Sequence, residues 1–399
     1  MPTLLQINAC MKFSVGKITQ HIGNIAINNG WESWIAYSGR TEATASDSNL
    51  IKVGNLLDSC IHYAEDKLLD NEGLSSILAT RKLLKTIDTI HPDIVHLHII
   101  HDHWLNYKLL FNYLAKNNIP VVWTQHDQWP TTGHCMYAPS NCERWKYECH
   151  HCPFSKKYSL DRSRRNYRLK KNLLSIIPSL TIVAVSEWMG NIICQSHLKD
   201  RPVYTIHNGI DIDTFSPQFD NIRQKYGINQ DKKIILGVAA VWDARKGLPD
   251  FYKLANQLPQ DKYTIVIVGK RTKKVKQPAD GCQIIFIDRI TDASELAKIY
   301  SSASVFVNPT YQDNYPTTHL ESLACGTPVV TYRTGGGPES IDESTGSIVE
   351  PGDINALIQA ITHFANGDFT DVCRKKAETH FDYHKCFIPY IHIYNSLLH

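Results

Sequence analysis

Short apolar stretches alternate with helix-like stretches along most of the chain. The apolar stretches are rich in Val and Ile and lack regular polar alternation. Strands of this composition are buried on both faces, as in parallel sheets covered by helices. They fall at residues 3–9, 32–39, 93–100, 120–127 and 181–186, and again at 232–241, 263–269, 282–288, 304–310 and 328–334. The pattern therefore predicts an α/β protein with two doubly wound domains.

The change between the two sets of strands falls at residues 204–217, "YTIHNGIDIDTFSP", where Gly and Pro indicate a linker. We place an N-terminal domain at 1–205 and a C-terminal domain at 206–380. A last helical segment, 381–399, should pack back toward the N-terminal domain, because one of its faces is apolar. The apolar side chains on that face are Phe387, Ile391, Tyr394 and Leu398.

Composition supports a two-domain globular protein and excludes some partners. The chain has 399 residues, 43% of them hydrophobic and 20% charged, which is long for a single core. A formal net charge of +3 is too small to indicate nucleic-acid binding. The first residues, "MPTLLQINACMKF", resemble a first strand more than an export signal. With no uncharged apolar run near the ~20 residues of a membrane span, we expect a cytoplasmic protein with mostly reduced thiols among its 11 cysteines.

Residues 308–332, "NPTYQDNYPTTHLESLACGTPVVTY", place two carboxylates on either side of a predicted helix start. Seven residues lie between Asp313 and Glu321. We expect a strand to end near Pro309 and a helix to occupy 317–325, so that the segment between them lies at the carboxyl end of the sheet, where open α/β sheets bind ligands.

The backbone N–H groups at this helix start can receive an anionic phosphate, and Pro316 is preset for the first turn. The residues that offer them are Tyr315, Thr317 and Thr318. Capping by either Thr is an equally good explanation and is compatible with phosphate binding. With an acid on each side of the phosphate to accept hydroxyl hydrogen bonds, the segment suits a ligand built of sugar, diphosphate and ribose.

This segment resembles the donor-binding signature of the family 4 retaining GT-B glycosyltransferases, in which two acids precede a small-residue helix and "GTPVV". Further likenesses are "HNGIDIDTF" between the domains, the late turn "TGGGPESI", and "VWTQHDQWPTTGHC" on the acceptor side. The resemblance implies the GT-B fold, with two Rossmann-like domains and an interdomain cleft. It also implies that Asp313 contacts the donor sugar and Glu321 the ribose. Glu is commoner than Asp at the first position, and here Asn314 follows it.

The loop "WDARKGLPDF" offers positive charge for the diphosphate. In the family an Arg and a Lys five residues apart bind this group; Lys246 matches the Lys, whereas Val241 stands where the Arg is usual. Arg245 either replaces that Arg or is an ordinary surface side chain. In the loop after the first strand, Gly16 permits a close backbone approach to phosphate or acceptor. The full donor-binding set that we predict is Gly16, Arg245, Lys246, Asn314, Tyr315, Pro316, Thr317, Thr318 and Glu321.

His126 aligns with a family His that lies close to the donor sugar and the acceptor. The alternative is a hydrogen-bonded structural His. Retention in the family is usually described as a front-face substitution in which the departing phosphate helps to deprotonate the acceptor, so no side-chain nucleophile is required. A double displacement would need a carboxylate, and Asp127 is the obvious neighbour, with its role open. We predict the catalytic set His126, Lys246, Asp313 and Glu321.

Two clusters suggest metal ligands. The first is His96, His98, His101 and His103, of which the last two lie beyond the strand end. The family that this chain resembles commonly shows a "DIVHLH" strand without a metal, so the resemblance favours a cleft-lining role. The second lies in a Cys-rich insertion at about 127–160 and can hold a structural zinc; reduced buried cysteines or disulfides are the alternatives. Its members are Cys135, Cys142, Cys149 and Cys152. We expect no catalytic cofactor, because Lys246 and the helix start can take the charge of the leaving group.

Two basic stretches remain. Residues 156–172 carry eight Lys or Arg against one Asp, and 270–276 carry five basic residues. The first is either a solvated helix or a contact with anionic lipid at the inner leaflet, where each basic residue contributes about 1 kcal/mol.

Together these features predict a retaining transferase that moves a sugar from a nucleotide-diphosphate-sugar donor. Its acceptor would be a cell-surface polysaccharide or a polyprenyl-diphosphate-linked oligosaccharide. A sugar-nucleotide epimerase of the same architecture and a non-catalytic carbohydrate-binding protein are the alternatives. Product analysis separates them, because an epimerase interconverts donor sugars without any acceptor.

Overall fold

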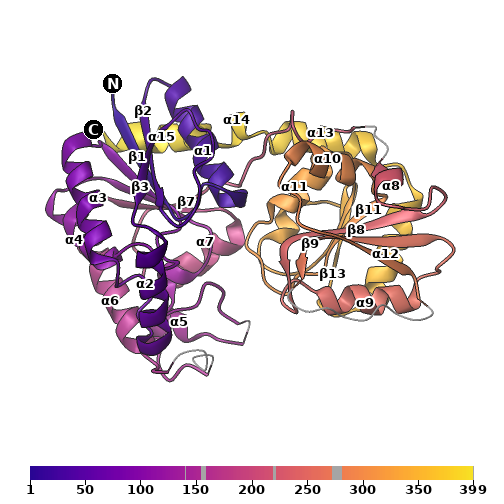
Figure 1. Cartoon of the computed structure of the whole chain (residues 1–399), viewed down its shortest axis with the longest axis horizontal. Helices are drawn as coiled ribbons and strands as arrows, with labels where there is room; N and C mark the ends of the chain where they lie inside the picture. Colours follow the sequence, from indigo (N-terminus) through magenta and orange to yellow (C-terminus); the bar gives the residue numbers. More distant parts are fainter. Residues whose placement is uncertain (140, 154–158, 219–221, 272–280, 399) are drawn as a thin grey trace. The chain divides into compact units, whose positions relative to one another are not determined.

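The computed structural model describes residues 1–139, 141–153, 159–218, 222–271 and 281–398. The chain forms two compact units (Figure 1). Unit 1 consists of Met1–His207 and Phe387–His399, and unit 2 of Asn208–Cys386. Each unit is built on one parallel sheet, in agreement with the predicted α/β class.

Unit 1 contains a seven-stranded sheet in the order β3-β2-β1-β4-β5-β6-β7, with every neighbouring pair parallel. Its strands are β1 (Thr3–Asn8), β2 (Glu32–Ser38), β3 (Asn49–Val53), β4 (Ile94–Leu97), β5 (Val121–Gln125), β6 (Leu180–Ala184) and β7 (Val203–Thr205). All residues of β1, β4, β5 and β6 are buried, which explains their continuous apolar sequences.

The helices of unit 1 cover both faces of this sheet (Figure 1). They are α1 (Phe13–Asn28), α2 (Leu56–Leu69), α3 (Ile77–Ile90), α4 (Tyr107–Lys116), α5 (Arg144–Tyr147), α6 (Ser163–Ser175), α7 (Glu187–Cys194) and α15 (Ile388–Leu397), with a short 3-10 turn η1 (Trp129–Thr131). Helices α3, α4 and α6 lie in one layer, while α1 contacts α15 in the other.

Helix α15 is attached to the centre of the unit 1 sheet through buried hydroxyl groups. The Tyr394 hydroxyl lies 2.6 Å from Nδ1 of His96 on β4, and the Tyr390 hydroxyl lies 3.0 Å from Oγ1 of Thr124 on β5. Nε2 of His96 lies 2.8 Å from the same Thr124 oxygen. The end of the chain is therefore part of the unit 1 core.

Unit 2 contains a six-stranded parallel sheet in the order β10-β9-β8-β11-β12-β13. Its strands are β8 (Lys233–Trp242), β9 (Tyr263–Arg271), β10 (Gln283–Ile287), β11 (Val305–Asn308), β12 (Val329–Tyr332) and β13 (Gly346–Val349). Its helices are α8 (Ile222–Lys225), α9 (Leu248–Gln257), α10 (Ala293–Ser302), α11 (Thr317–Ala324), α12 (Ile354–Asn366), α13 (Thr370–His380) and α14 (Tyr383–Cys386), with a 3-10 turn η3 (Gly337–Ser340).

No helix in the described part of the chain is both long enough and apolar enough to cross a bilayer.

Candidate functional site

The loop between β11 and α11 lies at the carboxyl end of the central strand β11 and is bonded to the loops on both sides. The Tyr311 N–H donates to the Arg245 carbonyl in the loop after β8, at 2.8 Å. The Gly336 N–H, in the turn after β12, donates to the Asn314 carbonyl at 2.7 Å. Three loops from neighbouring strands thus form one hydrogen-bonded unit, which fixes the backbone of the predicted donor segment.

Two glycines allow these loops to approach so closely. Gly247 has φ +77°, and a Cβ there would lie 2.0 Å from the Pro309 carbonyl oxygen. Gly335 has φ +56°, and its Cβ would lie 1.7 Å from the Asp313 carbonyl oxygen. Any side chain at either position would collide with backbone. This explains why Gly follows Lys246 and why the late turn is Gly-rich.

Lys246 and Asp313 form an ion pair within this unit, with Nζ 2.5 Å from Oδ2. Burial alone would raise the pKa of Asp313. The Lys246 ammonium, with smaller contributions from Arg245 and the Asn314 N–H, more than compensates, so the pKa is lowered from its ordinary value. The Arg245 guanidinium donates to the Gln312 carbonyl at 2.9 Å and so holds the same loop from a second side. Both predicted cations therefore contact the predicted donor loop.

Glu321 projects from the second turn of α11, where the hydroxyl of Tyr300 on α10 donates to its Oε2 at 3.0 Å. Tyr300 is fully buried, and burial raises the pKa of its hydroxyl well above the ordinary value. Tyr300 therefore remains a hydrogen-bond donor and orients the Glu321 carboxylate. Tyr300 was not among the residues predicted from the sequence, because its helix carries no motif.

The amino end of α11 follows Pro316 and has no side-chain cap. Thr317 and Thr318 begin α11, and the preceding carbonyl of Tyr315 accepts a hydrogen bond from Asn208 Nδ2 at 3.1 Å. The first N–H groups of a helix have no intrahelical partner. The helix starts four residues after Asp313, whose carboxylate binds Lys246, so it follows directly on the fixed loop unit.

In unit 1, His126 follows β5 and is part of a chain of hydrogen bonds across three strands. Gln6 Nε2 donates to the Thr19 carbonyl, so Gln6 Oε1 is the acceptor that faces His98 Nε2 at 3.1 Å. His98 Nδ1 in turn lies 3.1 Å from His126 Nε2. Burial lowers the pKa of His126 to about 4 and that of His98 well below its ordinary value.

Both rings are therefore neutral near pH 7, and the hydrogen-bond order determines their tautomers. His98 carries its proton on Nε2, so His126 must donate from Nε2 to His98 Nδ1. Nδ1 of His126 is then an acceptor, and it makes no hydrogen bond with the residues that the structure describes. This ring nitrogen is the group that His126 offers to a ligand.

Asp127 is bonded on both of its carboxylate oxygens. Oδ1 accepts from the Trp129 N–H at 2.9 Å, and Oδ2 lies 2.9 Å from Nε2 of His101. Nδ1 of His101 lies 3.6 Å from Glu72 Oε1. Burial lowers the pKa of His101, but the two carboxylates outweigh it and raise the pKa to about 10. Asp127 is thus paired with an imidazolium.

Gly16 lies inside α1 and is buried. A Cβ there would lie 2.4 Å from the carbonyl carbon of Met11 and 2.8 Å from the Cys10 carbonyl oxygen. We predicted that Gly16 permits a close approach of the backbone to phosphate or acceptor. In the structure, the backbone that lies close to Gly16 is the chain's own β1–α1 loop.

The four histidines between 96 and 103 have separate partners. His103 pairs with Asp66 at 3.1 Å, and the partners of His96, His98 and His101 are given above. None of the four belongs to a group with metal-ligand spacing among the described residues, so a metal site here has no support. His96 is fully buried and bonded to Tyr394 of α15, so the cleft-lining interpretation was wrong for this residue.

All 11 cysteines lie among the described residues, and none forms a disulfide there. Cys135 and Cys152 come together with His134 at metal-ligand spacing, while Cys142 and Cys149 line the same small cavity.

The basic stretch 156–172 is largely engaged within unit 1. Arg164 and Arg168 both pair with Glu148, at 2.6 and 2.5 Å. Lys170 is buried, donates to the Trp129 carbonyl at 2.5 Å and lies 3.8 Å above the Trp129 ring. Residues 156–158 of this stretch, and 272–276 of the second one, lie outside the described residues.

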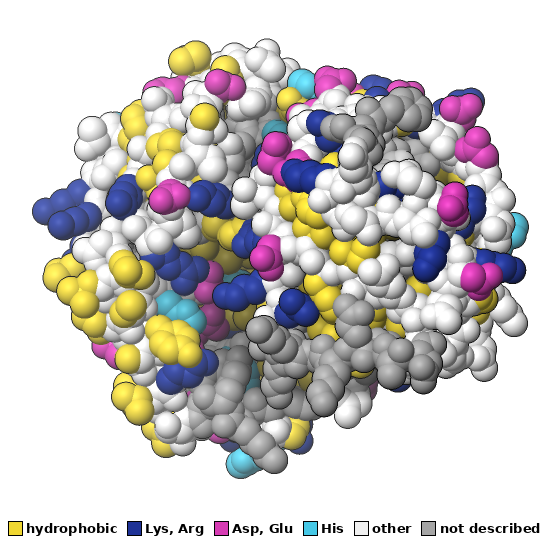
Figure 2. Space-filling view, turned by 45° about the vertical axis from the view of Figure 1, so that its right-hand side comes forward, with side chains coloured by type: hydrophobic (Ala, Val, Ile, Leu, Met, Phe, Trp, Pro, Cys, Tyr) yellow, Lys and Arg dark blue, Asp and Glu magenta, His cyan; other side chains and the backbone are white. Residues whose placement is uncertain are grey.

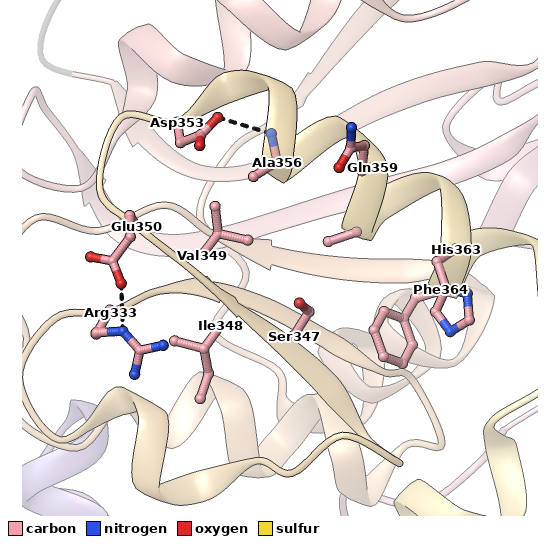
Figure 3. Close-up of a pocket in the computed structure, with 11 residues that line it drawn as sticks. Arg333, Ser347, Ile348, Val349, Glu350, Asp353, Ala356, Gln359, His363 and Phe364 are labelled. Atoms are coloured by element: carbon pink, nitrogen blue, oxygen red, sulfur yellow. Dashed lines mark hydrogen bonds and ion pairs between the residues drawn. The ribbon is translucent and has the colours of Figure 1, made fainter.

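A groove also lies at the edge of the unit 2 sheet, between β13 and α12 (Figure 3). Arg333 and Glu350 form an ion pair at one end, and His363 and Phe364 lie at the other. None of the site residues predicted from the sequence lines it.

Comparison with known proteins agrees with this geometry. A family described as "Glycosyltransferase Family 4" matches residues 61–214, and one described as "Glycosyl transferases group 1" matches residues 218–380. The putative colanic acid biosynthesis glycosyl transferase WcaC of Escherichia coli is 26% identical over 70% of this chain and 69% of its own length. The capsular polysaccharide biosynthesis glycosyltransferase CapM of Staphylococcus aureus is 22% identical over 47% of this chain and 52% of its own length.

Solved structures share the fold over the whole chain. Sucrose-phosphate synthase of Thermosynechococcus elongatus superposes with a TM-score of 0.70 at 17% identity, covering 100% of this chain and 99% of that one. HepE of Anabaena, solved in complex with UDP, superposes with a TM-score of 0.63 at 14% identity, covering 99% and 100%. With a family match in each unit and two parallel sheets of this architecture, the chain belongs to the family 4 glycosyltransferases of GT-B fold.

Proposed function

We propose that the protein is a retaining glycosyltransferase that uses a nucleotide-diphosphate-sugar donor. The observation that carries the proposal is the fixed loop unit of unit 2, which presents Lys246, Asp313 and the start of α11 together. In this proposal the diphosphate lies at the α11 start and contacts Lys246, while Glu321 accepts hydrogen bonds from the ribose hydroxyls. HepE, whose fold this chain shares, has been solved with UDP and with UDP-glucose.

Cleavage of the sugar–phosphate bond develops negative charge on the diphosphate. Lys246 and the positive end of the α11 dipole would stabilise that charge, in a loop unit whose backbone is already fixed by hydrogen bonds. When the diphosphate binds, Lys246 must share its ammonium between the phosphate and Asp313. Asp313 then becomes free to accept a hydroxyl of the donor sugar. On these grounds we propose catalysis without a resident cofactor, with Arg245 as a positioning residue for the loop.

Retention is proposed to follow the front-face course, in which the departing phosphate takes the proton of the acceptor hydroxyl. The state of the unit 1 residues supports this. His126 is neutral and offers Nδ1 as an acceptor, which suits it to orient a sugar hydroxyl. Asp127 is bonded by His101 and by the Trp129 N–H, so neither oxygen is poised as a nucleophile for a double displacement.

The donor site is tested with Glu321→Ala and with Glu343→Ala, an exposed Glu of the same unit, as its control. We expect the Glu321 variant to bind its nucleotide-diphosphate sugar about 10- to 100-fold more weakly, since hydrogen bonds to a charged group contribute about 1.5–3 kcal/mol. A thermal-shift screen of nucleotide-diphosphate sugars first identifies the donor, and isothermal titration calorimetry then compares the variants. The proposal would be refuted by wild-type affinity and turnover in the Glu321 variant.

For the acceptor we propose a cell-surface polysaccharide or a lipid-linked oligosaccharide. The names of WcaC and CapM, which refer to colanic acid and capsular polysaccharide biosynthesis, support this class. Release of free nucleotide only when such an acceptor is present distinguishes transfer from epimerisation.

We also propose that the protein acts at the cytoplasmic membrane surface, through α2 and the start of α3. Helix α2 is oriented with its polar side inward: His62 lies 2.9 Å from both Ser76 Oγ and the Gly73 nitrogen, and Asp66 pairs with His103. Its apolar side chains face out, with Leu57 70% exposed. The other exposed apolar residues of these helices are Leu56, Ile61, Tyr63, Leu68, Ile77 and Leu78.

The neighbouring charge favours anionic lipid as the occupant of this surface. Helix α3 exposes three basic residues and no acid over its first three turns; these are Arg81, Lys82 and Lys85. The left of Figure 2 shows hydrophobic side chains gathered among Lys and Arg on one face. Because most α6 cations are already paired or buried, this surface is a better candidate than the basic stretch itself.

Vesicle flotation tests the membrane proposal. We expect wild-type protein to float with phosphatidylglycerol vesicles at low salt, and the variant Leu57→Asp with Ile61→Asp to remain in the soluble fraction. Val372→Asp, at an exposed apolar position of unit 2, is the matched control and should float like wild type. Equal flotation of all three proteins, or flotation of none, would exclude this surface.

A further inference from the structure

The Cys-rich insertion lines a small cavity, and none of the residues assigned to transfer is part of its lining. Its lining includes all four cysteines of the insertion and His134. The cavity has a volume of about 20 Å³, which is room for one water-sized particle or a single metal ion. Four thiols and an imidazole around so small a cavity are typical of a metal-binding site rather than of a packing defect.

Three potential ligand atoms already converge on this place. A ring nitrogen of His134 and the Sγ atoms of Cys135 and Cys152 all lie within 4.8 Å of one another. In a tetrahedral zinc site with Zn–S bonds near 2.3 Å, ligand atoms are roughly 3.5–3.8 Å apart. A contraction of at most about 1.3 Å would therefore bring these three atoms into coordination.

His134 is oriented as metal-ligating histidines are. Its Nδ1 lies 3.0 Å from Oδ2 of Asp70, and both side chains are almost fully buried. Asp70 is itself fixed, because the same oxygen accepts from the Arg162 N–H at 2.8 Å. Ligating histidines donate their second N–H to such a carboxylate. With Nδ1 used in this way, Nε2 is the nitrogen left for an ion.

Cys149 lies outside the group of three at metal-ligand spacing, but it is the thiol best placed to supply the fourth ligand. Its Sγ accepts a hydrogen bond from the Gly133 N–H at 3.3 Å, which places the sulfur against the residue preceding His134. Cys142 lines the cavity as well but is not part of this contact. An oxygen-ligand site formed by Asp70, His134 and Asp161 is less suitable, because Asp161 already accepts the N–H groups of Cys152 and Ser163.

We propose that His134, Cys135, Cys149 and Cys152 bind one Zn²⁺ in a closed, tetrahedral structural site. Three thiolates and an imidazole select zinc over harder cations, and four protein ligands leave no position for a substrate. This set differs from the four cysteines predicted from the sequence by replacing Cys142 with His134. The ion would join the segment 133–135, which follows β5 and η1, to the segment 149–152 at the far end of the insertion.

The site is tested on the full-length protein purified under reducing conditions without added metal. We expect about one zinc per chain by elemental analysis, and a Co²⁺-substituted protein with the strong visible absorption of tetrahedral thiolate coordination. Removal of the metal with a zinc-selective chelator should lower Tm, and added Zn²⁺ should restore it. This measurement needs no variant, so it stands even if some variants fail to fold.

Serine variants then identify the ligands. Cys135→Ser, Cys149→Ser and Cys152→Ser should each lose zinc, while Cys142→Ser should retain it. Cys60→Ser and Cys194→Ser, at exposed positions of the same unit, are the matched controls. The proposal is overturned if the wild-type protein contains no stoichiometric zinc, or if Cys149→Ser keeps the metal and Cys142→Ser loses it.

Discussion

His126 and Asp127 are adjacent in the chain, yet their surroundings give them opposite electrostatic states. His126 is neutral because it is buried and bonded only to another neutral ring. Asp127 is paired with His101, which lies between it and Glu72 and whose pKa these two carboxylates raise to about 10. A neutral imidazole that faces a ligand and a carboxylate already neutralised by an imidazolium are suited to orientation, and neither is suited to nucleophilic attack.

This assignment predicts the behaviour of Asp127→Asn. An amide oxygen can still accept from the Trp129 N–H, so we expect the variant to retain turnover, reduced roughly 10-fold by the loss of one charge-assisted hydrogen bond. The pKa of His101 should fall because one of its two carboxylates is gone, which NMR titration of its ring can measure. Asp200→Asn, at an exposed site of the same unit, is the control. Complete loss of activity, together with a glycosyl adduct on wild-type Asp127 in intact-mass spectra, would instead establish a double displacement.

At the residue scale, what could be predicted from sequence was the set of groups adjacent to a strand end. Lys246, Asp313 and Glu321 follow strands or begin a helix, and a motif marks each of them. What could not be predicted were their partners. Tyr300 lies 21 positions before Glu321, and Glu72 lies in a different loop from His101. Such pairs depend on tertiary packing, which leaves no local pattern.

At the element scale, the strands that sequence reasoning missed are all at sheet edges. The predicted set lacks β3 and β7, the two edges of the unit 1 sheet, and β13, one edge of the unit 2 sheet. Most of β3 is exposed or partly exposed, and β7 has only three residues. An edge strand pairs on one side only, so it does not need the continuous apolar sequence by which central strands are recognised. The edge strand β10 was found because four of the five residues in its sequence, QIIFI, are apolar.

The end of the chain shows the same dependence on packing. A single helical segment was predicted over 381–399, and the structure has α14 and α15 there, with Phe387 between them and Pro389 in the first turn of α15. Proline favours the first turn of a helix and disfavours its interior, so a helix boundary here is expected in retrospect. Three of the four residues predicted for the apolar face, Phe387, Ile391 and Tyr394, are buried, whereas the fourth, Leu398, is 40% exposed. The hydroxyl contacts of Tyr390 and Tyr394 could not be predicted, because periodicity treats Tyr as apolar.

At the scale of the whole molecule, the buried neutral histidines are distributed unequally between the two units. Burial lowers the pKa of five histidines in unit 1, namely His62, His96, His98, His126 and His197. In unit 2 it lowers that of His319, to about 4. Carboxyl groups with lowered pKa values, such as Asp313, change the folding stability only at pH values below their ordinary pKa values of 3.8 to 4.5. Between about pH 4.5 and 6.5, the pH dependence of the free energy of unfolding therefore comes from the histidines.

The sign of the effect follows from proton binding. The unfolded chain protonates these histidines as the pH falls below about 6.5, while the folded protein keeps them neutral down to about pH 4. Since the unfolded state then binds more protons, the free energy of unfolding decreases on acidification, by up to about 1.4 kcal/mol per pH unit for each such group. His101 acts in the other direction only above pH 6.5, where its contribution is lost as the pH rises toward 10.

Unit 1 should therefore lose stability several times more steeply than unit 2 between pH 6.5 and 4.5. Hydrogen exchange read by mass spectrometry, corrected for intrinsic rates, can compare peptides from β4 and β5 with peptides from β11 and β12. His197→Gln serves as a partial control, because the amide can still donate to the Pro130 carbonyl that His197 contacts, while the titrating group is removed. This variant should flatten the pH dependence of unit 1 and leave that of unit 2 unchanged. Equal slopes in the two units would show that these histidines are hydrated or charged in the folded protein, and the tautomer assigned to His126 would then have to be abandoned.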